Sequence, residues 1–68
     1  MVEERFNLRN RIIGVLLKDA REKANRSKRE CADALGVSSS TITSYEAGRK
    51  GISLPELEVL AYLFDVPV

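Results

Sequence analysis

The sequence predicts a small all-α domain, a compact bundle of four to five helices. Three observations support this fold class. Apolar residues recur at steps of three and four along most of the chain, which is the spacing of amphipathic helices. Serines that can cap a helix stand before three of these stretches, at Ser27, Ser38 and Ser53. No stretch alternates apolar and polar residues as a half-buried strand would.

The amino-terminal part divides into a polar segment and one helix. We expect residues 1–10 to be a flexible segment without secondary structure. From about Arg9 to Ala24 the apolar spacing predicts the first helix. Lys23 and Asn25 favour its end there, because cations complement the helix dipole and Asn tolerates a C-terminal turn. The apolar stripe consists of Ile13, Leu16, Leu17, Ala20 and Ala24.

Residues 27–48 predict two short helices joined by a tight turn. Ser27 with Glu30 three positions later forms a capping box, which starts a helix over about 28–35. Gly36 follows at the position where helices commonly end in the left-handed conformation.

The second of these helices begins after Ser38, only two residues beyond the glycine. Val37 before this cap and Ile42 four residues after it have the spacing of a hydrophobic staple, which fixes the angle of the helix. Two short helices with crossed axes and a glycine turn make a helix-turn-helix motif.

A loop over 48–52 and a fourth helix complete the chain. Ser53 caps this helix, Pro55 is tolerated in its first turn, and Glu56 completes a second capping box. Pro67 could begin a fifth helix, because proline is favoured at the first helical position. The expected inward positions are Leu57, Leu60, Ala61 and Phe64, widened by Leu54, Val59 and Leu63.

The composition excludes several classes of function. The single Cys31 allows no internal disulfide, and without histidine there is no zinc cluster, so we expect a buried thiol. We predict no metal site, no cofactor and no enzymatic activity, because no set of titratable groups converges. The chain lacks a membrane-length apolar run and a signal peptide, which predicts a cytoplasmic protein without membrane contact.

Charge is distributed unevenly along the chain. The net charge is only +1, but all 11 Lys and Arg lie in residues 1–52 against seven acidic residues, and residues 53–68 hold three acids. This asymmetry is typical of a domain that meets an anion with one face. Ordinary solvated charges would give a similar distribution, so both explanations remain open.

The third helix, over about 39–47, has a face that carries only short side chains. With Ile42, Tyr45 and Glu46 assigned inward, that face can approach the floor of a DNA major groove closely. The alternative is an amphipathic helix with a merely solvated polar face. The outward residues are Ser39, Ser40, Thr43, Ser44 and Ala47.

Cations and helix amino termini surround this face. Both can bind phosphates, since free backbone amides at a helix start attract anions. The candidate phosphate contacts are Ser27, Lys28, Arg29, Ser38, Arg49 and Lys50.

Over residues 12–67 the chain resembles the phage repressor and Cro family of helix-turn-helix domains, also called XRE-like. The order and spacing of several short motifs carry the resemblance together. They are Ile13 with Gly14, Arg21, ALGVS at 34–38, ITSYEAGRK at 42–50 and LPELEVLAYLFDVP at 54–67.

The resemblance implies a lambda-repressor-like fold and specific roles for individual residues. It implies an internal ion pair between Arg21 and Glu46 and a phosphate contact at Lys28. The outer face lacks the Arg, Gln, Asn and Lys side chains that make bidentate base contacts, so we expect modest specificity. The implied base contacts are Ser39, Ser40, Thr43 and Ser44.

Residues 11–68 are therefore predicted to be a DNA-binding domain of a repressor-like transcriptional regulator that binds double-stranded DNA as a homodimer. We expect a fifth helix or a C-terminal domain, with a possible protein partner, to be missing. Cytoplasmic localisation would include association with the nucleoid. Two alternatives stay open: a protein-interaction module with the same fold, and an antitoxin-type regulator that also binds a partner protein.

Overall fold

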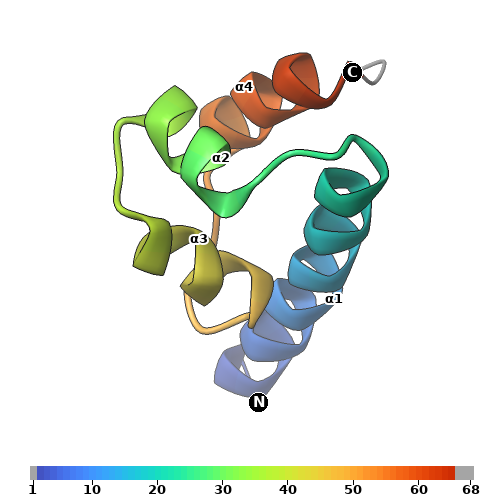
Figure 1. Cartoon of the computed structure of the whole chain (residues 1–68). Coiled ribbons are helices and arrows are strands. Elements are labelled where there is room, and N and C mark those ends of the chain that lie inside the picture. The colour runs from blue at the N-terminus through green and yellow to red at the C-terminus, as the bar shows by residue number, and fades with distance from the viewer. Residues whose placement is uncertain (1, 66–68) are drawn as a thin grey trace.

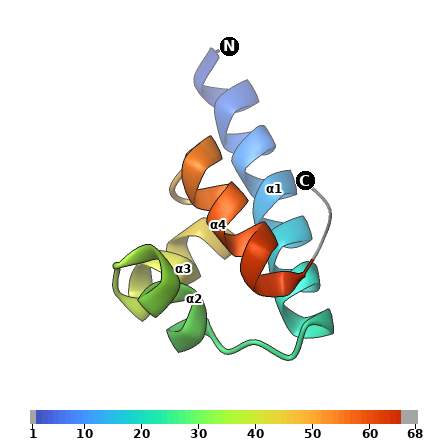
Figure 2. The same ribbon diagram turned by 90° about the horizontal axis from the view of Figure 1, so that it is seen from above.

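The computed structural model describes the backbone of residues 2–65 and the side chains of residues 8–65. Within that range it contains four helices and no strand, which confirms the all-α fold class. Helix α2 packs against both α3 and α4, and α1 packs against α3. Seen from above, α2 and α3 lie together to one side of α1 (Figure 2). The helices are α1 (Val2–Lys23), α2 (Lys28–Leu35), α3 (Ser39–Glu46) and α4 (Leu54–Phe64) (Figure 1).

Helix α1 is longer than the sequence pattern indicates. It begins at Val2 and not near Arg9, so the prediction that residues 1–10 lack secondary structure is wrong for the described part of that segment. A polar first turn does not prevent a helix, since Glu and Arg have good helix propensity. The flexibility of this segment stays a prediction. The expected fifth helix at Pro67 lies outside the described residues.

The turn between α2 and α3 forms as the capping residues predict. The Ser27 hydroxyl accepts a hydrogen bond from the Glu30 amide at 3.0 Å, and the Glu30 carboxylate accepts one from the Ser27 amide. Gly36 ends α2 with a φ of 70°, in the left-handed region that costs glycine little. The Ser38 hydroxyl then accepts from the Thr41 amide and starts α3.

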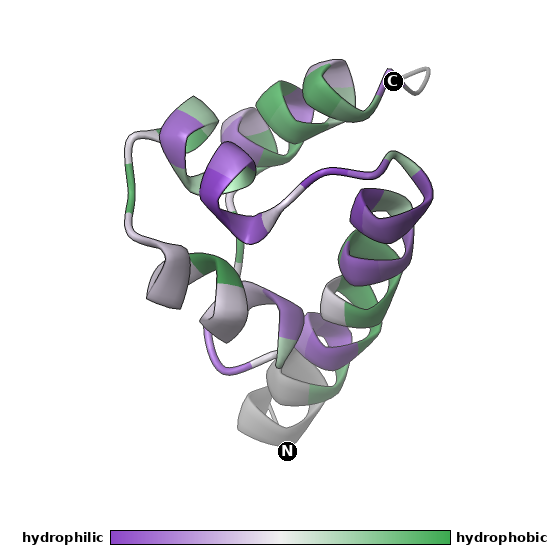
Figure 3. Ribbon diagram, in the orientation of Figure 1, coloured by the Kyte–Doolittle hydropathy of each residue, from purple (hydrophilic) through white to green (hydrophobic). Residues whose placement is uncertain are grey.

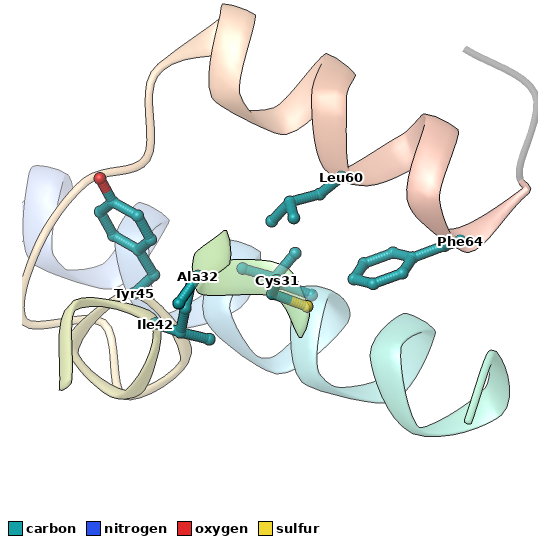
Figure 4. Packing of buried hydrophobic residues seen from close by; sticks show 7 residues of the cluster. Cys31, Ala32, Ile42, Tyr45, Leu60 and Phe64 are labelled. Atoms are coloured by element: carbon teal, nitrogen blue, oxygen red, sulfur yellow. The ribbon is translucent and has the colours of Figure 1, made fainter. Parts of the chain in front are cut away.

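The core lies where α2, α3 and α4 meet α1. Figure 4 shows Leu60 and Phe64 of α4 pointing toward Cys31 of α2, while Ile42 lies beneath Ala32. The burial predicted for Cys31 is confirmed, because its side chain is 1% exposed. The fully buried cluster consists of Leu17, Cys31, Ala32, Ile42, Tyr45, Leu60 and Phe64.

Three residues assigned to the apolar stripes do not lie in the core. Leu16 is 63% exposed, Leu54 is 68% exposed and Val59 is 42% exposed. The apolar stripes predicted from the sequence are wider than the buried ones, because a domain of this size covers only a narrow strip of each helix.

Gly14 allows α1 and α3 to approach each other closely. A Cβ atom at this position would lie 2.5 Å from the carbonyl oxygens of both Tyr45 and Glu46. These oxygens belong to the backbone at the end of α3, so they cannot rotate away as a side chain could. Glycine therefore sets the distance between the two helices.

The second capping box connects α4 to α3. Glu56 accepts hydrogen bonds from the Ser53 amide and hydroxyl, and also from the Tyr45 hydroxyl at 3.0 Å. Burial, followed by this hydrogen bond, raises the pKa of Tyr45. The hydrogen bond between Tyr45 and Glu56 thus links the end of α3 to the start of α4, across the loop that joins them.

Candidate nucleic-acid interface

Helix α3 separates its residues into two faces as the sequence predicts. Ile42, Tyr45 and Glu46 are buried, while Ser39, Ser40 and Thr43 are exposed. We call the exposed set, together with Ala47, the outer face of α3. Ser44, also predicted to contact bases, is only half exposed and lies at the margin of this face.

Two hydroxyl groups of the outer face, those of Ser40 and Thr43, form hydrogen bonds within the protein. The Ser40 oxygen lies 2.8 Å from that of Ser38, which also lies 3.1 Å from the Thr41 hydroxyl. The Thr43 hydroxyl donates to the carbonyl oxygen of Ser39 at 3.3 Å. These bonds orient the side chains before any ligand binds, so less rotamer entropy is lost on binding.

Lys28, from the first turn of α2, reaches across to this face. Its ammonium nitrogen donates to the Thr43 hydroxyl oxygen at 3.2 Å, which joins two residues 15 positions apart. The sequence places Lys28 at the edge of the motif as a phosphate contact, whereas the structure brings its charge beside a predicted base contact. No sequence signal links positions 28 and 43, because the crossing angle of the two helices decides this distance.

The remaining predicted phosphate contacts lie on α2 and in the segments before α2, before α3 and after α3. Arg29 lies on α2, and Arg49 and Lys50 lie in the loop after α3, all exposed. The Ser27 and Ser38 hydroxyls are occupied as caps, so their contribution to an anion site would come from the surrounding backbone amides. Cations thus border the uncharged outer face.

An ion pair between Arg21 and Glu46 fastens α1 to the end of α3. The Arg21 Nε lies 2.6 Å from one carboxylate oxygen and its Nη2 lies 3.3 Å from the other. The side chains are 12% and 5% exposed, and the hydrogen bond to Glu46 raises the pKa of Arg21. Arg21 also donates to the Arg26 carbonyl oxygen at 2.9 Å, so it connects α3 to the segment before α2 as well.

Two features of the interface were not predicted from the residues. One is the Lys28 contact, and the other is the close approach at Gly14, a residue that entered only through the family resemblance. A glycine inside an apolar helical stripe is a signal for close backbone approach, so this second feature could have been inferred.

Comparison with known proteins agrees with this arrangement. A family model described as a helix-turn-helix domain matches residues 12–68. The chain is a helix-turn-helix domain of the XRE type. Members of this family bind DNA, and in this XRE-type domain the two helices of the motif are α2 and α3.

The XRE-type domain is similar to several proteins named as transcriptional regulators. It is 42% identical over 62 residues to an HTH-type transcriptional regulatory protein of Thermococcus kodakarensis. It is also 42% identical over 65 residues to one of Thermococcus gammatolerans, and 45% identical over 49 residues to the regulator AnsR of Bacillus subtilis. These matches cover 91%, 96% and 72% of the chain.

The XRE-type domain is shorter than these relatives. It spans 20% of each Thermococcus protein and 42% of AnsR. No solved structure matches it significantly.

Two further properties concern the described residues alone. None of their helices has both the length and the hydrophobicity needed to cross a membrane. The same residues contain no group of three or more acidic or thiol side chains that could hold a metal ion.

Proposed function

We propose that this domain recognises an operator in double-stranded DNA and acts as the DNA-binding part of a repressor-like regulator. The supporting observation is the outer face of α3, which combines short side chains with a border of cations. Side chains this short let the helix approach base edges closely, and the cations would neutralise the phosphates on either side.

In this proposal α3 enters the major groove and α2 lies across the backbone. Ser39, Ser40, Thr43 and Ser44 would contact base edges through hydroxyls, and the Thr43 methyl suits a thymine methyl. Regulation would follow from occupancy of the operator. The lack of long polar side chains on this face suggests that backbone contacts supply most of the affinity and DNA shape much of the specificity.

The test is Ser40→Glu, which places a negative charge in the middle of the outer face. Because residue 40 lies in the first turn of α3, a carboxylate there suits the helix dipole and folding should be retained. We expect binding to duplex DNA to be abolished with the melting temperature unchanged. Ser40→Ala is the matched control and should bind. Unchanged DNA binding by Ser40→Glu would contradict the proposal.

A homodimer on a palindromic operator is the second part of the proposal. Leu8, Ile12 and Val15 of α1 are 54–65% exposed, at the helical spacing of one face turned away from the core. In Figure 3 the edge of α1 that faces away from α3 carries green segments, the colour of hydrophobic residues. A second copy docked there would leave both outer faces of α3 free for half-sites about 34 Å apart.

A groove between α1 and α4 extends this apolar face. It encloses about 210 Å³ and is lined only by apolar residues, among them Ile13, Leu16, Leu57 and Ala61. Exposed apolar patches of this kind mark interaction sites in soluble proteins.

The same surface supports an alternative function, that of a regulator which also binds a partner protein. Sedimentation of the pure chain separates the two, with Ile12→Ser as the variant. A dimer that Ile12→Ser converts to a monomer supports the homodimer. A wild-type chain that remains monomeric at millimolar concentration, with or without operator, would favour the protein partner.

We infer that a protein of this function acts in the cytoplasm, where it would associate with the nucleoid when bound to DNA. The absence of enzymatic activity stays a prediction, consistent with the regulatory names of the relatives.

A further inference from the structure

We propose that Lys28 contacts a guanine base directly, with Thr43 holding its ammonium group over the outer face of α3. This inference depends on the proposed binding of DNA by α3 and assigns its base preference. It departs from the role of Lys28 as a phosphate contact that the family resemblance implies.

The position of the ammonium group is the first argument. The Lys28 nitrogen lies 3.2 Å from the Thr43 oxygen, and Thr43 is an exposed residue of the outer face. Lys28 is itself half-buried, whereas the other cations that border α3 are exposed. A lysine that extended away toward a phosphate would not contact the middle of this helix.

Hydrogen-bond geometry defines which atoms remain for DNA. The Thr43 hydroxyl has one hydrogen, which it donates to the Ser39 carbonyl oxygen, so it accepts its bond from Lys28. The ammonium group has three N–H donors and uses one of them here. Two donors therefore remain, next to the methyl group of Thr43.

A group that can only donate discriminates among base edges. Guanine presents two adjacent acceptors, N7 and O6, in the major groove. Adenine places a donor amino group beside its N7, and cytosine presents only a donor there, so both would oppose an ammonium group. Thymine presents a single acceptor, O4, so it satisfies one of the two free donors where guanine satisfies both. The outer face of α3 otherwise carries only hydroxyl and methyl groups, which makes Lys28 its one cation among the described residues.

Selection from a random duplex pool tests the proposal, with the wild-type chain and Lys28→Met compared at the same salt concentration. We expect the wild type to select guanine at one position of each half-site. Lys28→Met should reduce that preference roughly 5- to 10-fold while leaving the other positions of the motif unchanged. Arg29→Met, which removes the exposed cation next to Lys28 in the chain, should weaken binding to all DNA sequences equally and leave the selected motif unchanged.

The other outcomes overturn the proposal in distinguishable ways. If Lys28→Met weakens binding uniformly and selects the same motif, Lys28 contacts a phosphate. If the wild-type motif has no guanine that depends on Lys28, the base assignment is wrong although DNA binding stands. If the wild type shows no salt-dependent DNA binding at all, the proposed function itself fails, because phosphate contacts require that dependence.

Thr43→Val tests the positioning of the lysine separately. Valine keeps the shape and a methyl group but removes the acceptor, so the guanine preference at the Lys28-dependent position should relax. Thr43→Ser retains the acceptor and should preserve it. In a double-mutant cycle, adding Lys28→Met to Thr43→Val should change that preference little further. Additive effects of the two substitutions would show that Thr43 does not position Lys28.

Discussion

The two faces of α3 differ in what their side chains contact. On the inner face, Ile42 is fully buried in the core, Tyr45 bonds to Glu56 of α4, and Glu46 pairs with Arg21 of α1. On the outer face, the Ser40 hydroxyl bonds to the cap of α3, and the Thr43 hydroxyl donates to the Ser39 carbonyl oxygen and accepts from Lys28. One helix eight residues long therefore joins three others through one side and presents the opposite side to solvent.

This difference explains how such a small domain can keep its core while the proposed binding surface varies. Substitutions on the inner face leave buried groups without partners, whereas those on the outer face alter hydrogen bonds that water can replace. The inner face should therefore control stability and the outer face should control affinity for DNA.

Arg21→Met should have the largest effect on stability. It leaves the Glu46 carboxylate, 5% exposed, without its counter-charge, and breaking a buried pair costs about 3–5 kcal/mol. Chemical denaturation measures the loss. Lys23→Met, which breaks an exposed ion pair with Asp19 on the same helix, is the control and should cost less than about 1 kcal/mol. Equal losses for the two variants would contradict a special role of the buried pair.

Adjacent residues on α3 should give opposite results. Ile42→Ala removes a fully buried side chain and should cost about 2–5 kcal/mol, because it leaves a cavity. Thr43→Ala alters an exposed side chain and should change the free energy of unfolding by no more than about 0.5 kcal/mol. Thermal melting of both variants measures the difference. A comparable fall in melting temperature would show that the two faces are not separated.

Gly14→Ala should destabilise the domain by about 1–3 kcal/mol, since the added methyl group meets two backbone oxygens at 2.5 Å. Helix propensity alone would predict stabilisation, because alanine is the better helix former. The sign of the change in melting temperature therefore decides between the two effects. A more stable variant would show that α1 and α3 can separate without cost.

The two capping boxes should have the smallest effect on stability. Because each contains a glutamate, they should make the free energy of unfolding depend on pH in the acid range. Hydrogen bonds from the Ser27 amide and then from Arg26 lower the pKa of Glu30. Partial burial opposes the shift at Glu56, but hydrogen bonds from Ser53 and Tyr45 outweigh it and lower the pKa of that carboxyl as well.

Both carboxyls thus bind a proton less tightly in the folded state than in the unfolded state. Their stabilising effect is complete above the unfolded pKa of about 4.3 and is lost as pH falls through the lower folded values. Glu56→Gln should reduce this acid dependence more than Glu30→Gln, because only Glu56 joins two helices. Melting temperatures between pH 6 and pH 2.5 measure it, and a larger effect of Glu30→Gln would contradict the expectation.

Most of the local structure of this protein follows from its amino-acid sequence. The serine caps, Gly36 and the apolar spacing defined α2, α3 and α4 closely, because capping and left-handed turns depend on residues only a few positions apart. The early start of α1 could not be predicted, because no capping residue precedes it and its polar first turn lacks the apolar spacing of a helix that packs on a core. The division of α3 into two faces also followed from helical periodicity.

Which distant residues meet depends on how the helices pack. The contact between Lys28 and Thr43, the bond from Tyr45 to Glu56 and the exposure of Leu16 all depend on the angles at which helices cross. Those angles depend on the packing of the whole core and on the approach that Gly14 permits, so periodicity in the sequence does not encode them. The candidate base contacts could be proposed from the sequence, whereas the cation beside them could not.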